Sequence, residues 1–126
     1  MANELILIVE DNPKNLKLMR DVLQFKGYRV AEAETGEDGV RLARELHPDL
    51  ILMDIQLPGI SGITAFRQIR EDSATARIPG IAVTASAMTQ DRQTIMAAGF
   101  DGYQSKPLHV KAFIEAVRQM MLDHRG

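Results

Sequence analysis

The sequence predicts an α/β fold, a doubly wound parallel sheet in which five strands alternate with five helices. A continuous apolar run, 50–53, ends on Asp54 and then breaks into a Pro/Gly turn, as a parallel strand covered by helices on both faces does. A second run, 5–9, ends on Glu10 and Asp11 and leads directly into a helix start. Since parallel strands joined by right-handed crossovers share one carboxyl edge, these acids are expected to meet there.

The first strand is predicted over residues 4–9 and the first helix from Pro13 onward. Asn12 is a suitable N-cap. Pro13 is tolerated at the first helical position, because an N–H there would have no partner within the helix. The helical spacing of apolar residues continues to Gly27, which is expected to end the helix. Its inward face is predicted to carry Leu16, Met19, Val22 and Leu23.

The second strand is predicted over 28–33, where β-forming residues alternate with charged ones that indicate a sheet edge. Thr35 opens a segment with the form of a capping box, which predicts a helix that runs to about Leu46. His47 and Pro48 are expected to end this helix.

The second half of the chain continues the alternation. After the strand that ends at position 54, a turn-rich loop precedes a helix over about 63–71. A strand over 80–85, a helix over about 88–98 that Gly99 ends, and a short strand over 102–105 follow. The last helix is predicted from apolar residues at helical spacing, namely Val110, Phe113, Ile114, Val117 and Met121.

Composition and charge narrow the possible functions. The 126 residues, 45% hydrophobic and 25% charged, are typical of one globular domain, with no apolar run near the roughly 18 residues of a membrane span. The first residues do not resemble an export signal, so we expect a cytoplasmic protein without membrane association. The absence of cysteine excludes disulfides and thiol catalysis. With a net charge of −2 and scattered basic residues, direct nucleic-acid binding is not expected.

The polar residues at the predicted strand ends form a chemically coherent set. Acids without a neighbouring His or Cys favour a hard cation such as Mg²⁺. A hydroxyl and an amine facing the same acids favour a phosphoryl group, with one carboxylate as the nucleophile that becomes an aspartyl phosphate. The set consists of Glu10, Asp11, Asp54, Thr84 and Lys106.

Four motifs carry a family resemblance that covers essentially the whole chain. They are Ile8-Val9-Glu10-Asp11-Asn12, Leu52-Met53-Asp54-Ile55-Gln56-Leu57-Pro58, Ala82-Val83-Thr84-Ala85 and Ser105-Lys106-Pro107. In this order and spacing the sequence resembles the receiver domain of two-component response regulators. The resemblance implies a flavodoxin-like fold with strand order 2-1-3-4-5 and a single receiver domain over residues 1–126. Within the family the chain is most similar to the small stand-alone DivK type, because Asn15 follows the first motif and the second motif matches closely.

The resemblance also implies a role for each matching residue. Asp54 is similar to the phosphoacceptor, and Lys106 to the lysine that binds the phosphoryl group, with a cis bond to the next proline. Thr84 resembles the switch hydroxyl, and Tyr103 stands where an aromatic side chain turns inward with it. The Mg²⁺ ligands implied are Glu10, Asp11, Asp54 and the backbone carbonyl of Gln56.

The function implied is a signalling switch in a phosphorelay rather than an enzyme with a separate substrate. Its expected partners are a histidine kinase or histidine phosphotransfer protein and a downstream protein target, with the chain itself a monomer or weak homodimer. An alternative is a receiver domain that belongs to a larger hybrid kinase or regulator. A haloacid-dehalogenase-type phosphatase is a rival, but it needs a second acid where this chain has Gln56. A flavodoxin-like cofactor module is another, although Glu10 and Asp11 would repel its phosphate.

Overall fold

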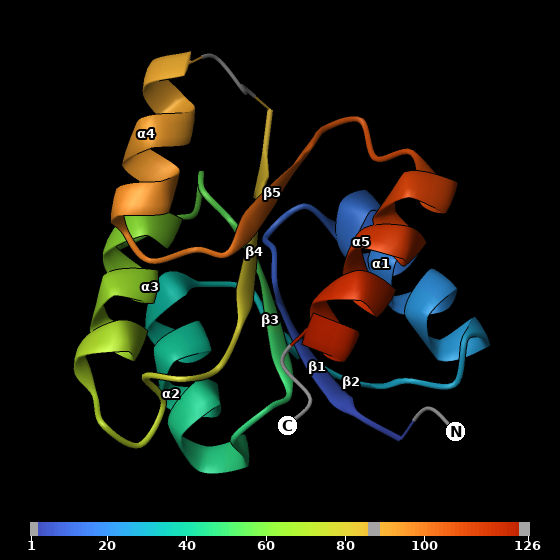
Figure 1. Cartoon of the computed structure of the whole chain (residues 1–126), viewed down its shortest axis with the longest axis horizontal. Coiled ribbons are helices and arrows are strands. Elements are labelled where there is room, and N and C mark those ends of the chain that lie inside the picture. The colour runs from blue at the N-terminus through green and yellow to red at the C-terminus, as the bar shows by residue number, and fades with distance from the viewer. Residues whose placement is uncertain (1–2, 86–88, 124–126) are drawn as a thin grey trace.

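The computed structural model describes residues 3–85 and 89–123 and shows strands alternating with helices along the chain (Figure 1). No helix in this described part is long and apolar enough to span a membrane. The elements are β1 (Leu5–Val9), α1 (Pro13–Phe25), β2 (Arg29–Ala33), α2 (Gly36–Leu46), β3 (Leu50–Asp54), α3 (Gly62–Glu71), β4 (Gly80–Thr84), α4 (Thr89–Ala97), β5 (Gly102–Ser105) and α5 (Val110–Asp123).

The predicted sheet is confirmed: its five strands are parallel and stand in the order β2-β1-β3-β4-β5. Helices α1 and α5 cover one face, and α2, α3 and α4 cover the other (Figure 1). Alternate residues of a strand point to opposite faces, so β1 contributes Ile6 and Ile8 to one core and Leu7 and Val9 to the other. This two-sided burial explains why the central strands are uninterrupted apolar runs.

The helix starts follow the predicted capping residues. The Asn12 side chain accepts hydrogen bonds from the amides of residues 14 and 15, and the Thr35 hydroxyl accepts from Asp38. The boundaries differ from the predictions by about a residue; α3, for example, begins at Gly62 instead of residue 63. The predicted start of α4 at Met88 lies outside the described residues. The helix predicted from Val110 and the apolar residues that follow it is present as α5, although Val110 itself is 42% exposed.

His47 ends α2 in a left-handed conformation, with φ 47° and ψ 61°. A residue with a Cβ is strained there by about 1–2 kcal/mol, whereas glycine is not. We expect His47→Gly to raise the free energy of unfolding by about 1 kcal/mol, after allowing for the greater freedom of glycine in the unfolded chain. Urea unfolding measures this change. His47→Ala keeps the Cβ and is the control; an equal gain in that variant would contradict the explanation.

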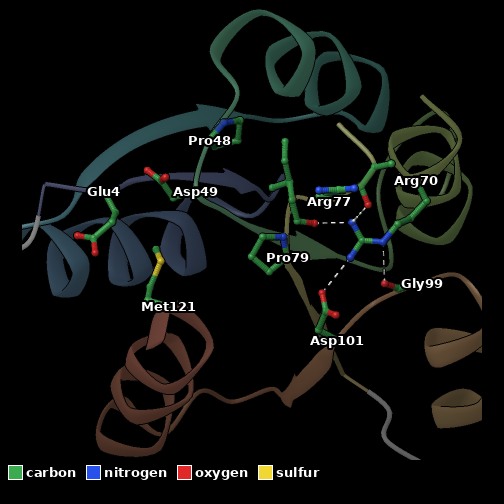
Figure 2. A pocket seen from close by; sticks show the side chains of 11 residues that line it. Glu4, Pro48, Asp49, Arg70, Arg77, Pro79, Gly99, Asp101 and Met121 are labelled. Carbon is green, nitrogen blue, oxygen red and sulfur yellow. Dashed lines mark hydrogen bonds and ion pairs between the residues drawn. The ribbon is translucent and has the colours of Figure 1, made fainter. Parts of the chain in front are cut away.

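Arg70, at the end of α3, ties together the amino-terminal edge of the sheet (Figure 2). Its Nε donates to the carbonyl oxygen of Gly99 at 3.0 Å, and its Nη1 donates to the carbonyl oxygens of Ala76 and Ile78. Its Nη2 lies 2.9 Å from the carboxylate of Asp101. One side chain therefore fixes the segment before β4 and the segment before β5 relative to α3.

The same guanidinium stacks on Phe66, with 4.5 Å between its central carbon and the ring centroid, and Phe66 in turn stacks on Phe100. Beside it is a hollow of about 690 Å³ (Figure 2). Two of its acids are already engaged, Asp101 by Arg70 and Asp49 by the Leu5 amide. This hollow lies at the sheet edge opposite to the predicted site.

Candidate functional site

Strand register brings the predicted site residues to the carboxyl edge of the sheet. Val9 pairs with Met53, so Glu10 and Asp54, the next residue on each chain segment, are neighbours. Thr84 pairs with Ser105, which places Lys106 immediately beyond β5 at the same edge. These polar residues lie at the carboxyl ends of four different strands, β1, β3, β4 and β5, as the sequence predicts.

The carboxylates of Glu10, Asp11 and Asp54 form one group, which we call the acidic cluster. One oxygen from each lies within 4.8 Å of the others. Glu10 and Asp54 are only 0% and 3% exposed, whereas Asp11 is open to solvent. The cluster is thus anchored in the core and accessible from one side.

Lys106 balances the buried part of this cluster. Its Nζ lies 2.9 Å from Asp54 Oδ2 and 3.1 Å from Glu10 Oε1. Burial lowers the pKa of Lys106, but its hydrogen bonds and charge interactions with Asp54 and Glu10 outweigh this and raise the pKa above its ordinary value. The bond from Lys106 to Pro107 is cis, as the family resemblance implies.

Glu10 is held in an unfavourable electrostatic environment. Burial, together with the hydrogen bond and negative charge of Asp54, raises its pKa to about 7, while the Asn12 amide and Lys106 oppose this rise. The Asn12 amide donates to Glu10 Oε2 at 3.1 Å. The opposite oxygen, Oε1, is buried and accepts no hydrogen bond of good geometry.

These features fit a divalent cation. All three side chains offer oxygen, the donor that Mg²⁺ prefers. Glu10 Oε1 lies 3.1 Å from Lys106 Nζ but accepts no hydrogen bond of good geometry, so a cation could use it as a ligand. One amide, that of Gln56, donates to Asp54 Oδ1 at 3.0 Å and fixes the orientation of this carboxylate. The predicted use of the Gln56 carbonyl as a further ligand stays a prediction.

Thr84 and Tyr103 lie on one face of the sheet. Tyr103 pairs with Ala82, and because Thr84 is two residues beyond Ala82 on β4, its side chain points to the same face as the tyrosine ring. Thr84 is 4% exposed, and Tyr103 is half-buried against the core beneath α2, α3 and α4. The structure therefore brings together the two residues predicted to act as a switch.

Arg92, on α4, belongs to none of the sequence motifs but contacts a predicted site residue. Its guanidinium lies over the Tyr103 ring, with 5.3 Å between its central carbon and the ring centroid. This contact joins α4 to β5, so only the packing of the helix on the sheet reveals it. An exposed arginine on a helix is too common to have marked this contact in advance.

Known proteins support the assignment of the fold and the family. The family profile described as the response regulator receiver domain matches residues 6–118. The polar-differentiation response regulator DivK of Brucella ovis is 45% identical over 118 residues, which are 94% of this chain and 96% of that protein. A similar DivK from Brucella anthropi is 44% identical over the same lengths.

Solved structures agree with this result. The receiver domain of a sensor histidine kinase from Pseudomonas aeruginosa, with a magnesium ion coordinated in its active site cleft, is 37% identical and covers 95% of this chain and 98% of that one, with a TM-score of 0.88. A CheY-like receiver domain from Methanospirillum hungatei is 26% identical, covers 98% and 97% of the two chains and has a TM-score of 0.90. The chain belongs to the response regulator receiver domain family.

Proposed function

We propose that residues 1–126 form a single receiver domain that acts in the cytoplasm as a phosphorylation-dependent switch of a two-component phosphorelay. The observation that carries this proposal is the position of Lys106 Nζ, 2.9 Å from Asp54 and 3.1 Å from Glu10, inside the acidic cluster. An amine held among carboxylates at an accessible sheet edge suits transfer of a phosphoryl group to one of them.

Asp54 is the proposed nucleophile. Its carboxylate attacks the phosphorus of a phosphohistidine, a P–O bond forms, and the P–N bond breaks with its electron pair going to the imidazole. Lys106 then pairs with the new phosphoryl oxygens instead of two carboxylates, and the Gln56 amide keeps the Asp54 carboxylate oriented. Glu10, Asp11, Asp54 and the Gln56 carbonyl would hold Mg²⁺, which would neutralise negative charge on the transferred group.

The proposed partners follow from this chemistry. The donor is a histidine kinase or histidine phosphotransfer protein, and the output is contact with a downstream protein through α4, β5 and α5. The likeness to the polar-differentiation response regulator DivK supports a role in polar differentiation. The chain has no separate substrate in this proposal and acts as a monomer or weak homodimer.

The direct test is to locate the phosphoryl group. The purified protein is incubated with a small phosphodonor, with Mg²⁺ or with a chelator in its place, and the modified peptide is identified by mass spectrometry. We expect one phosphoryl group on the peptide that contains Asp54, and only when Mg²⁺ is present. Modification of another residue, or labelling that is independent of Mg²⁺, would contradict the proposal.

Thr84→Ala is expected to separate accepting the phosphoryl group from responding to it. The nucleophile and the metal ligands remain, so labelling should persist, but a contact made only in the active state is lost. A charge-assisted hydrogen bond contributes about 1.5 to 3 kcal/mol, which lowers the active-to-inactive ratio roughly tenfold to a hundredfold.

The chain has two tyrosines and no tryptophan, so Tyr28→Phe makes Tyr103 the sole reporter of this response. In that background, phosphorylation should change the Tyr103 fluorescence of the parent but not of Thr84→Ala. Thr84→Ser keeps the hydroxyl and is the matched control, expected to respond like the parent. An undiminished change in Thr84→Ala would disprove the coupling between the two residues.

A further inference from the structure

The contact between Arg92 and Tyr103 joins a helix to a residue of the proposed switch. Arg92 is an exposed residue of α4, and its guanidinium carbon lies 5.3 Å from the centroid of the Tyr103 ring. This separation is within the roughly 6 Å at which a cation is attracted by an aromatic face. In Figure 1, α4 stands beside β5, the strand that carries this tyrosine.

The contact depends on where the ring lies. Tyr103 is half-buried: part of the ring packs on the core, and part is available to Arg92. Thr84 lies on the same face, two residues beyond the Ala82 that pairs with Tyr103, toward the acidic cluster. A ring that moves inward, toward Thr84, leaves the half-exposed position in which it now contacts Arg92.

We propose that Arg92 is a positioning residue that stabilises the resting state of this receiver by holding Tyr103 in its half-exposed position. The inference rests on the proposed function, in which Tyr103 turns inward with Thr84 on activation, as the family resemblance implies. The new element is a restraint that a residue of α4 places on this tyrosine. The restraint favours the resting state, so Arg92 opposes activation.

The contact between Arg92 and the Tyr103 ring sets the size of the expected change in affinity. A cation over an aromatic ring at an exposed site stabilises an arrangement by an amount equivalent to about a two- to fivefold change in an equilibrium constant. When the binding-competent state is the minor one, the apparent affinity of its ligand scales with its population. Removing the restraint should therefore tighten binding of a phosphoryl mimic by about two- to fivefold.

The probe is fluoroberyllate, a tetrahedral phosphoryl mimic, titrated in saturating Mg²⁺ and followed by the amide NMR signals near Asp54. Arg92→Ala is compared with wild type, and Arg92→Lys, which restores a cation, is the rescue variant. Arg77→Ala removes one exposed positive charge at the opposite edge of the sheet and controls for net charge. Arg92 and Ala at position 92 are also compared in a Tyr103→Leu background. This background removes the aromatic face but keeps an apolar side chain.

We expect Arg92→Ala to lower the apparent Kd about two- to fivefold, with Arg92→Lys close to wild type and Arg77→Ala unchanged. In the Tyr103→Leu background, Arg92→Ala should have no effect, since the cation then has no ring to hold. An unchanged or raised Kd in Arg92→Ala overturns the inference, and so does an equal effect in the Tyr103→Leu background. If wild type does not bind fluoroberyllate at all, the proposed function fails and the inference fails with it.

Discussion

Asp54→Asn is expected to gain no phosphoryl group under conditions in which the wild-type protein gains one. Asparagine has nearly the shape of aspartate, but its amide is not a nucleophile, so the chemistry stops while the fold survives. Asp54 is 3% exposed at the end of a buried strand, where a larger change of shape would disturb the core. The loss should be complete, because no other group in the proposed mechanism forms the bond to phosphorus.

The measurement is intact mass after incubation with Mg²⁺ and a small phosphodonor. Asp49→Asn is the matched control, since Asp49 precedes the same strand at the opposite edge of the sheet. Its carboxylate accepts a hydrogen bond from the Leu5 amide, which an asparagine oxygen can also accept. This control should be labelled like wild type, and equal labelling of Asp54→Asn and wild type would remove Asp54 from the mechanism.

The second large effect concerns the metal-free protein, which is expected to lose about 2 to 3 kcal/mol of stability between about pH 5 and pH 8. The cause is Glu10, whose pKa rises from 4.5 to about 7 on folding because of burial and of Asp54. A raised carboxyl pKa means that the folded state binds the proton more tightly than the unfolded state, so this contribution falls as the pH rises from 4.5 to about 7. The raised pKa of Lys106 acts at higher pH and leaves this window unaffected.

Urea unfolding in the presence of a chelator measures this dependence. In Glu10→Gln the side chain cannot ionise, so the fall should disappear while the fold is kept. Mg²⁺ should also reduce the fall in wild type, because a bound cation favours the ionised carboxylates. If wild type is equally stable at both pH values, or if Glu10→Gln loses as much as wild type, the electrostatic description of the cluster is wrong.

The sheet could be predicted from the sequence because strands that are buried on both faces consist of uninterrupted apolar residues. Residues 6–9 and 50–53 are all apolar, and the first polar residue after each run marks the edge of the core. The same logic predicted that Glu10 and Asp54 meet, since parallel strands share a carboxyl edge. The capping residues Asn12 and Thr35 were predictable because they act on the backbone nearest to them.

Other features could not be predicted from the sequence, because they depend on contacts between segments that are far apart along the chain. The Arg92 contact with Tyr103 requires the placement of α4 on β5, and the four polar partners of Arg70 come from two separate segments. Val110 continues the helical period of α5 yet lies exposed, since periodicity gives the direction of a side chain but not where the core ends. The raised pKa of Glu10 likewise follows from burial beside another acid, which sequence alone does not measure.

The hydrogen bonds of Arg70 give this chain a non-covalent cross-link. They join the end of α3 to positions 6, 8, 29 and 31 residues further on, closing loops as a disulfide would in a secreted protein. The chain has no cysteine, and a guanidinium keeps its charge throughout the physiological pH range. The amino-terminal edge of the sheet is thus fastened in a way that reductants cannot loosen and that the physiological pH range leaves charged, whereas we expect the opposite edge to respond to both protons and a cation.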